Sequence, residues 1–411
     1  MKAGRVAALL LAATALAGPL VAQGAAASGE SLEVALLTFG PGAEVWEKFG
    51  HNAIVVLDRS TGQASAYDYG RFDFRQENFV LRFAQGRMWY SMGESPAQRV
   101  IDVYTRYDRS IWLQELAMTP AQKVALRDFL AWNYAEPNRN YFYDYYRDNC
   151  STRVRDALDR ALGGVLKARF DSVNTGISYR WHTARLTSGS PLLYTGLMLG
   201  LGHPTDRPIS AWEEMFLPVR LMDALALVTV PDGSGGSVPL VRAIEKIHAT
   251  TKYPEPAAPR PLLLPFLTAG LLLGSLLWIT GRSGTRAGRL IFGVLATIWS
   301  VVAGVGGVVL LALWLLTDHV AARGNASVLL LTPLSLVLVV LLPLAVRGRP
   351  RAARAALGTA LLVAAVAGLA ILTTAWPALR QPNPELLALI LPLHAGVVAG
   401  SAALARVAPA S

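Results

Sequence analysis

The chain has 411 residues, a formal net charge of +10 and a hydrophobic content of 53%. The excess of basic residues does not indicate a nucleic-acid-binding surface. From Leu262 onward ten Arg oppose only Asp318 and Glu385, and most of these Arg lie between apolar segments. Charge and apolar content together are typical of a membrane protein.

Residues 1–27 have the pattern of a secretory signal peptide: a basic start, an apolar core at 6–17 and a stretch of small residues. The core is too short to span a bilayer, and no cysteine directly follows it, so the chain is not predicted to be a lipoprotein itself. We expect cleavage between Ala22 and Ser28. The mature chain then starts outside the cytoplasm.

Residues 28–253 are predicted to form one soluble domain of mixed α and β character, long enough for its own core. Apolar or alternating runs predict three strands, and the last two, joined by the turn 59–63, predict a hairpin. Thr119-Pro120 should open a helix that ends near Pro137. The Pro-rich segment 254–261 is a stiff linker. The predicted strands are 34–38, 51–58 and 64–70.

Five apolar segments follow, each long enough to cross roughly 30 Å of hydrocarbon. Their approximate limits are 262–280, 290–316, 328–346, 355–376 and 386–405. Loops 281–289 and 347–354 hold three and four Arg, whereas loops 317–326 and 377–385 hold one each. Since Arg-rich loops stay in the cytoplasm, the linker is predicted outside and the C-terminus inside. This orientation agrees with an exported N-terminal domain.

Cys150 is the only cysteine. Apolar residues such as Val154 and Ala157 follow it at helical spacing, and Asp148 or Asn149 is a suitable N-cap, so Cys150 is predicted to open a helix. The positive end of the helix dipole and the unpaired amides of the first turn favour a thiolate there. A lone thiol in an oxidising compartment either is buried and structural or has a chemical role, and both readings stay open here.

A thiolate nucleophile needs a base that accepts and later returns a proton. His51 is the best placed histidine, because it follows Phe49-Gly50 and begins an alternating strand. The small Gly50 would let a substrate approach. The alternative is a histidine that is only hydrogen-bonded in place. The other histidines lie in irregular regions, near the linker, between spans or within one: His182, His203, His248, His319 and His394.

Four motifs resemble the periplasmic domain of the Lnb family of bacterial lipoprotein N-acyltransferases, and the five spans resemble the membrane domain of that family. The motifs are Phe49-Gly-His-Asn-Ala53, Tyr67-Asp-Tyr-Gly-Arg-Phe-Asp-Phe74, Asp148-Asn-Cys-Ser-Thr152 with Arg153 and Asp156, and Leu199-Gly-Leu-Gly-His-Pro-Thr-Asp206. The resemblance covers nearly the whole mature chain. It implies an α+β, circularly permuted papain-like fold, similar to NlpC-type and lecithin:retinol acyltransferase-type domains, followed by an all-α bundle of five spans.

The resemblance also implies a two-step acyl transfer at the bacterial inner membrane, with the catalytic domain in the periplasm and no cofactor. Cys150 would take a fatty acyl chain from a phospholipid as a thioester. The α-amine of a lipoprotein's N-terminal cysteine would then accept the chain, with His51 as base in each step. Helix N-terminal amides near Cys150 suit an oxyanion hole.

A third polar residue should orient His51. Asp68 is the first choice, although strand alternation puts only one face inward and a turn-side carboxylate is the alternative. The tyrosine-rich run 141–146 either lines an acyl groove or is core. The polar loop 317–326 either receives a headgroup or is simply hydrated. The candidate substrate-binding residues are Tyr67, Tyr69, Asn149, Ser151, Arg153, His319 and Asn325.

No set of His, Cys and carboxylates has metal-ligand spacing, so no metal site is predicted. The rival enzyme function is a thiol amidase or peptidase that acts on cell-wall peptide, but such a hydrolase needs at most one anchor. The rival from another class is a non-catalytic membrane assembly protein in which Cys150 is buried and inert.

Overall fold

The computed structural model describes residues 28–73, 75–232, 235–376 and 380–407. The predicted signal peptide lies outside the described residues. Contacts divide the chain into two compact units. The first, the sheet unit, comprises the residues up to Phe83, Arg87–Tyr179 and Pro208–Ala257. The second, the helical unit, comprises Ala84–Gly86, Arg180–Arg207 and Ala258–Ser411.

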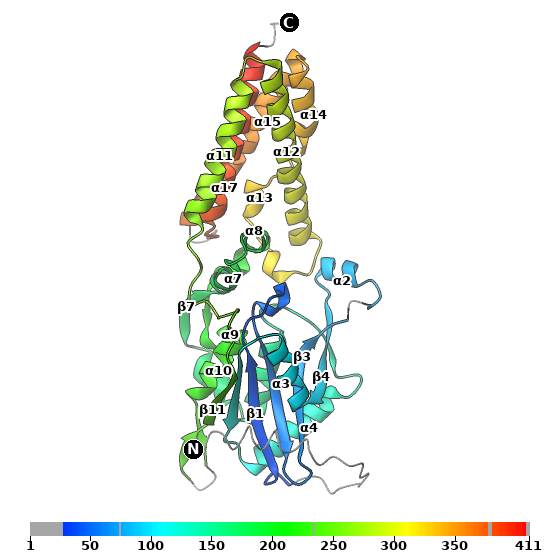
Figure 1. Cartoon of the computed structure of the whole chain (residues 1–411), viewed down its shortest axis with the longest axis vertical. Helices are drawn as coiled ribbons and strands as arrows, with labels where there is room; N and C mark the ends of the chain where they lie inside the picture. Colours follow the sequence, from blue (N-terminus) through cyan, green and yellow to red (C-terminus); the bar gives the residue numbers. More distant parts are fainter. Residues whose placement is uncertain (1–27, 74, 233–234, 377–379, 408–411) are drawn as a thin grey trace. The chain divides into compact units, whose positions relative to one another are not determined.

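An antiparallel seven-stranded sheet forms the centre of the sheet unit, in the order β11-β5-β1-β2-β3-β4-β6 (Figure 1). The predicted hairpin is confirmed, since β2 and β3 pair from Ala53 opposite Asp68 to Asp58 opposite Gln63. Sequence neighbours pair from β1 to β4, while β5, β6 and β11 add to the edges. The strands are β1 Leu32–Phe39, β2 His51–Asp58, β3 Gln63–Arg71, β4 Trp89–Pro96, β5 Ile111–Leu116, β6 Asn140–Phe142 and β11 Val241–His248.

Both faces of this sheet are covered, because its central strands are apolar on both sides. On one face, α3 (Ala97–Arg106) packs on Leu37, Phe39 and Val55. On the other face, α4 (Pro120–Tyr134) and α5 (Cys150–Ala161) pack on Leu36 and Ile54. The predicted start of α4 is confirmed, since the Thr119 side chain caps it through the amide of Gln122.

Shorter elements complete the sheet unit around this core. Helix α2 follows β3, and the 3-10 helix η1 precedes β2. After α5 the chain forms α6, α9 and α10 together with two small two-stranded sheets, β7–β8 and β9–β10. Their limits are η1 Val45–Glu47, α2 Phe79–Gln85, α6 Val165–Phe170, β7 Asn174–Ser178, β8 Pro208–Ser210, α9 Ala211–Glu214, α10 Pro218–Ala226, β9 Thr229–Pro231 and β10 Ser237–Pro239.

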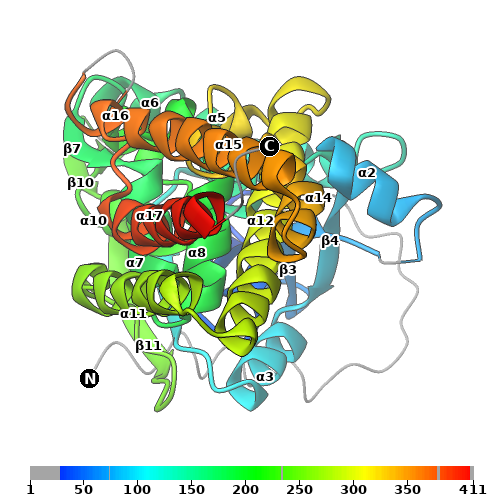
Figure 2. The same cartoon turned by 90° about the horizontal axis from the view of Figure 1, so that it is seen from above.

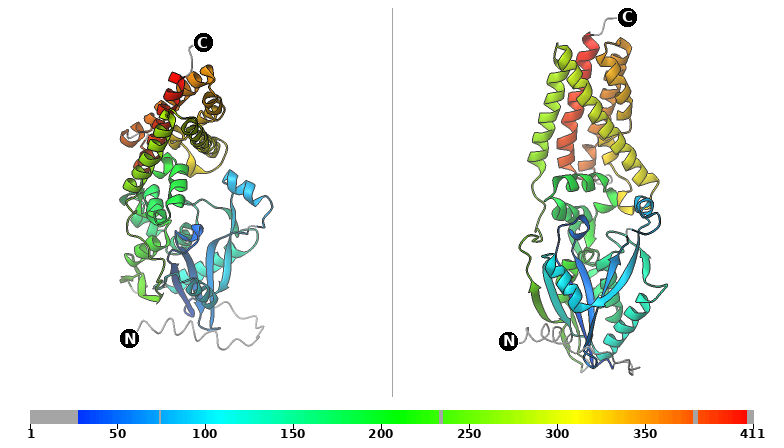
Figure 3. Two further views of the ribbon diagram at one scale, coloured as in Figure 1. Left: turned by 45° about the horizontal axis from the view of Figure 1, so that its top comes forward. Right: turned by 45° about the vertical axis from the view of Figure 1, so that its right-hand side comes forward.

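Among its described residues the helical unit holds five helical segments long and apolar enough to cross a membrane, at the five places predicted from composition. The third and fourth are each built from two consecutive helices, and the long helices lie side by side (Figure 3). The segments are Leu263–Arg282 (α11), Arg286–Leu315 (α12), Ser327–Val346 (α13 Ser327–Leu330 and α14 Ser335–Val346), Pro350–Thr374 (α15 Pro350–Leu369 and most of α16 Leu372–Ala375) and Pro384–Arg406 (within α17 Pro384–Val407).

Small residues let the first and last of these helices approach closely. A Cβ atom at Gly270 would clash with the carbonyl oxygen of Ala388, and one at Gly274 would clash with that of Pro392. Close backbone contact at small residues is a usual way to join helices in lipid, where apolar side chains gain little by leaving the solvent.

The segment 180–207 packs on the ends of the apolar helices through buried polar groups. It contains α7 (Tyr179–Thr187) from its second residue, α8 (Pro191–Gly200) and η2 (His203–Thr205). The guanidinium of Arg180, a residue only 4% exposed, donates hydrogen bonds to Asp206 and Asn383. The amide of Gln381 donates to Asn325 and to a backbone carbonyl of the segment. These bonds hold residues far apart in sequence together.

Candidate active site

The ends of β2 and β3 bring a histidine and a carboxylate together. His51 begins β2 and Asp68 lies near the end of β3, and Nε2 of His51 is 3.2 Å from Oδ2 of Asp68. Each side chain is 15% exposed. Asp68 is thus positioned to fix the orientation of the His51 ring.

Arg71 holds the other oxygen of Asp68. Its Nε donates to Oδ1 at 2.7 Å, and Nη2 reaches the Ser95 hydroxyl at 3.0 Å. Burial alone would raise the pKa of the Asp68 carboxyl, but the hydrogen bonds and charges of His51 and Arg71 prevail and hold it below its ordinary value of 3.8. Asp68 is therefore ionised and acts as an acceptor toward both neighbours.

Cys150 is the first residue of α5, as predicted, and Asn149 is its N-cap. The side-chain oxygen Oδ1 of Asn149 accepts hydrogen bonds from the backbone amides of Ser151 and Thr152, each at 2.9 Å. The side-chain amide of Asn149 also donates to the backbone carbonyls of Tyr145 and Phe216, which fixes the start of the helix in the fold. The Asn149 side chain does not accept a hydrogen bond from the backbone amide of Cys150, which also lies in the first turn.

The thiol of Cys150 lies close enough to the imidazole of His51 to influence its charge. Burial alone would lower the pKa of His51, but the interactions with Tyr104 and Cys150 and the hydrogen bond to Asp68 outweigh it and raise the pKa well above 6.5. The site thus favours an imidazolium next to the sulfur atom.

Gly70 makes the approach of α5 to β3 possible. Its φ is +91°, a left-handed conformation that side chains disfavour, and a Cβ placed there would lie 3.3 Å from Cβ of Cys150. The pairing of β3 with β4 is irregular between Asp68 and Arg71, so the strand bends at this point. The bend and the missing side chain bring the thiol to the strand end.

Three tyrosines lie near enough to the thiol to be influenced by it. Burial and then the neighbouring Cys150 raise the pKa of Tyr90 to about 12 and hold those of Tyr141 and Tyr143 well above 10. Tyr141 is 5% exposed and part of the core, as one of the two readings of the run 141–146 expected. Within the same run Phe142 is 59% exposed. Because their pKa values are raised, Tyr90, Tyr141 and Tyr143 are neutral, and their rings present apolar faces and polar hydroxyl groups near the thiol.

Tyr104 and Arg109 are two site residues that the sequence did not indicate. The Tyr104 ring of α3 lies nearly parallel to His51, with centroids 6.0 Å apart, and the Arg109 guanidinium lies 4.6 Å from the Tyr104 centroid. Arg109 is 4% exposed, and its Nε donates to the carbonyl oxygen of Gly40 at the end of β1. Only the pairing of β5, β1 and β2 brings these positions together, so no local sequence signal marks them.

Strand alternation separates two of the predicted substrate-binding residues from His51. Tyr69 is 1% exposed, its hydroxyl donates to Asn133, and Tyr67 packs beside it on the core face. Asp68 points to the opposite face. Tyr69 is therefore part of the core, and Tyr67, which is partly buried, packs against that core.

Other predicted substrate-binding residues near Cys150 have structural partners. Ser151 is fully buried and its hydroxyl donates to the carbonyl oxygen of Met215. Arg153 makes a two-pronged ion pair with Asp148, at 2.6 and 2.8 Å, and lies over the Tyr141 ring. Asn149 is the helix cap. These contacts hold the start of α5 in place.

His319 and Asn325 belong to the helical unit. Asn325 is 1% exposed; its amide donates to the carbonyls of Leu199 and Gly200, and its carbonyl oxygen accepts from Ser327 and Gln381. Its hydrogen-bonding capacity is used within the fold. Among the described residues no group of three or more His, Cys, Asp or Glu could hold a metal ion.

Two family models match the chain. The model of the Lnb N-terminal periplasmic domain matches residues 22–187, and the model of the Lnb transmembrane domain matches residues 258–401. No curated protein and no solved structure matches. The first match contains Cys150, His51 and Asp68, and the second contains nearly all of the five apolar segments. The chain therefore belongs to the Lnb family and is a multi-pass membrane protein with a periplasmic domain.

Proposed function

We propose that this chain is a membrane-bound acyltransferase that moves a fatty acyl chain from a membrane phospholipid, through a thioester on Cys150, to the α-amine of a lipoprotein's N-terminal cysteine. The observation that carries the proposal is that Cys150, at a helix N-terminus, lies near the hydrogen-bonded pair of His51 and Asp68. The five apolar segments support lipid substrates, because they would anchor the chain that carries this thiol in a membrane.

In the first step the Cys150 sulfur attacks an ester carbonyl of the phospholipid, and His51 holds the thiol proton. A carbon–sulfur bond forms, and the amide of Cys150 is placed to stabilise the oxyanion. The carbon–oxygen ester bond then breaks. The lysophospholipid alkoxide leaves with the proton that His51 returns.

In the second step the amine of the lipoprotein attacks the thioester carbonyl. A carbon–nitrogen bond forms, His51 accepts the amine proton, and the carbon–sulfur bond breaks to restore the thiolate. Asp68 keeps the imidazole in the same orientation for both steps. A thioester suits this exchange, because it is more reactive toward an amine than the ester from which it came.

The same proposal includes the fold and the topology that family resemblance implied. The order of a histidine strand followed by a cysteine helix supports a permuted papain-like fold. The Arg-rich loops 281–289 and 347–354 support an inner-membrane location with the sheet unit in the periplasm and the C-terminus in the cytoplasm.

The test is the mass of a lipoprotein's N-terminal lipopeptide, taken from cells depleted of their own N-acyltransferase. Cells that express this chain should add one acyl group to the lipopeptide, and cells that express Cys150→Ala should add none. Equal amounts of both proteins in the membrane are the control. An unmodified lipopeptide with the wild-type chain would count against lipoprotein acylation.

A further inference from the structure

Helix α2 (Phe79–Gln85) exposes its apolar side chains. None of its seven residues is buried, and Val80, Leu81 and Phe83 are 79%, 56% and 46% exposed. In Figures 1 and 2 it lies beyond the ends of β3 and β4, apart from the helices that cover the sheet. Exposed apolar residues at this density mark a surface for interaction.

Neighbouring side chains extend this apolar surface. Trp46 of η1 lies edge-on to Phe72, with ring centroids 6.2 Å apart, and Phe72 in turn lies 6.5 Å from Phe79. Trp46 is 57% exposed and Val45 beside it 51%. We call this surface the α2 patch; it comprises Val45, Trp46, Phe72, Phe79, Val80, Leu81 and Phe83.

The C-terminal end of α2 is joined to the end of a membrane span. The carbonyl oxygen of Gln85 accepts a hydrogen bond from the amide of Asp318 at 2.8 Å, and a Cβ at Gly86 would lie only 2.7 Å from the amide nitrogen of His319. Asp318 follows closely after α12 (Arg286–Leu315), whose apolar residues would fill the bilayer. The last turn of α2 thus lies where a span leaves the hydrocarbon.

Helix length then limits how far the exposed side chains can be from the membrane. Seven residues span about 10 Å along a helix axis, so Val80 and Leu81 stay within about that distance of the bilayer boundary. Arg75, Arg82 and Arg87 are exposed around them, against Asp73 and Glu77. Apolar residues flanked by Arg are the composition of a helix that lies in a lipid–water interface.

An aromatic series connects the patch with the thiol. Phe72 lies 5.3 Å from Tyr90, and Tyr90 stacks on Tyr143 at 4.3 Å. The Tyr143 ring and Cβ of Cys150 both lie close to the vacant Cβ position of Gly70, at 3.6 and 3.3 Å. From these contacts we propose that the α2 patch inserts into the periplasmic leaflet and admits a phospholipid acyl chain toward Cys150. The admission of an acyl chain toward Cys150 rests on the proposed function, whereas the insertion of the patch does not.

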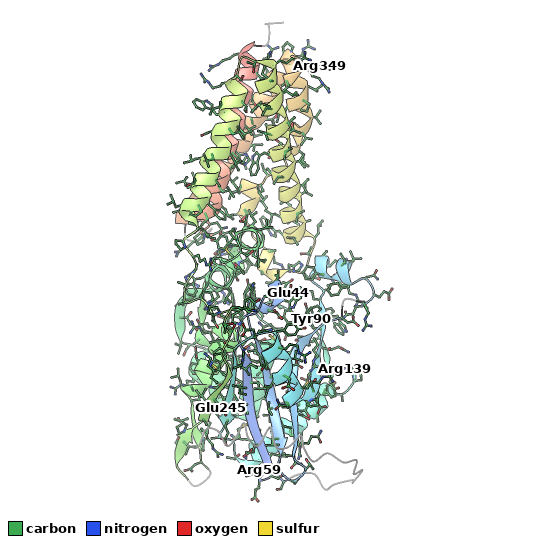
Figure 4. The ribbon with its side chains drawn as sticks, viewed as in Figure 1. Glu44, Arg59, Tyr90, Arg139, Glu245 and Arg349 are labelled. Atoms are coloured by element: carbon green, nitrogen blue, oxygen red, sulfur yellow. The ribbon has the colours of Figure 1, made fainter. Side chains whose placement is uncertain are left out.

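Insertion can be measured without catalysis. Because Cys150 is the only cysteine, its replacement by serine lets a new cysteine be labelled at a chosen position. In a Cys150→Ser background, Val80→Cys and, as a control, Thr61→Cys are labelled with an environment-sensitive fluorophore and reconstituted in phospholipid vesicles. Thr61 lies at the turn before β3, a strand that spans about 30 Å. In Figure 4 Glu44, which precedes the patch, and Arg59, near Thr61, lie at opposite ends of the sheet unit.

Lipids that have a nitroxide near the top of the acyl chain should quench the label at position 80 strongly and leave the label at position 61 bright. Equal quenching at the two positions, or none at position 80, would overturn insertion. This result does not depend on acyl transfer, so it stands even where the proposed function fails.

The acyl-chain role is tested with the active protein. Val80→Asp together with Leu81→Asp should slow transfer from vesicle phospholipid by about ten-fold or more, since two apolar groups lose their burial in lipid. Transfer from a monomeric short-chain phospholipid should stay within about two-fold, because the thiol is unchanged. Leu227→Asp, at a leucine 62% exposed beyond α10, is the matched control. An equal loss on both donors would contradict the role of the patch.

Discussion

The Asp68 carboxylate has two partners at once, His51 at one oxygen and Arg71 at the other. This arrangement keeps the carboxylate charged although it is largely buried, and it gives the imidazole a fixed acceptor at Nε2. The Cys150 thiol lies near the same ring. Orientation and charge at Cys150 therefore depend on a residue that does not contact it.

Asp68→Asn is predicted to slow acyl transfer by on the order of 10²-fold, because the neutral amide orients His51 poorly and does not stabilise its imidazolium. The folded state should persist. Asp108→Asn is the matched control, since it removes another His–Asp pair, Asp108 with His248 at 2.9 Å, that has no thiol beside it. Equal rates for the two variants would show that Asp68 has no part in the reaction.

The raised pKa of His51 predicts a pH dependence of stability. A group whose pKa is higher in the folded state stabilises the fold while it is protonated. This contribution is fully present below about pH 6.5, the unfolded value, and is lost as the pH rises through the folded pKa. The difference in unfolding temperature between the wild type and His51→Gln should therefore shrink from pH 6 to pH 9, as thermal melts can show. A difference that grows with pH would contradict this assignment.

Residue types and local spacing indicated part of this site in advance. A capping residue before a helical run predicted that Cys150 opens α5, because capping is a local interaction. Tyr104 and Arg109 could not be found in that way, since Tyr104 reaches His51 from α3 and Arg109 reaches Tyr104 from the residues just before β5. The face on which Asp68 lies depends on the pairing of β2 with β3, which brings Asp68 beside His51 and leaves Tyr67 and Tyr69 in the core.

At the scale of elements, the bend in β3 at Gly70 decides whether α5 can reach the strand end. The left-handed backbone turns the strand, and the missing side chain leaves room for Cys150. The left-handed backbone of Gly70 should affect stability, whereas its missing side chain should affect the position of Cys150.

Gly70→Ala is predicted to cost about 1–2 kcal/mol from the left-handed backbone and also to displace the start of α5. Gly176→Ala is the matched control, because Gly176 has φ +68° and nothing within 4 Å of its Cβ position. Both variants should lose similar stability in thermal unfolding, whereas only Gly70→Ala should also lose alkylation of Cys150 by iodoacetamide at its wild-type rate. Unchanged alkylation in Gly70→Ala would show that the close approach does not matter.

At the scale of the whole molecule, the apolar segments were the most predictable feature. Each is a signal summed over some twenty residues, so single substitutions hardly change it. The packing of 180–207 with the apolar helices was not predictable, because it rests on specific pairs such as Arg180 with Asn383. Such pairs leave no periodic pattern in a single sequence.

The Arg-rich loops predict the orientation of the chain. In a Cys150→Ser background, Arg323→Cys in loop 317–326 should react with a membrane-impermeant maleimide in intact spheroplasts, and Gly284→Cys in loop 281–289 should react only after lysis. Both positions are exposed in the fold, and Arg349 in Figure 4 marks the second Arg-rich loop. Labelling of Gly284→Cys in intact spheroplasts would reverse the proposed topology.

The central claim is that Cys150 holds the acyl chain between donor and acceptor. The most direct measurement is the mass of the peptide that contains Cys150 after the purified protein has met phospholipid vesicles without any lipoprotein. We predict a gain of one fatty acyl group that neutral hydroxylamine removes and that is lost when an acceptor lipopeptide is added. An unmodified Cys150 under conditions in which the acceptor still becomes acylated would contradict the account.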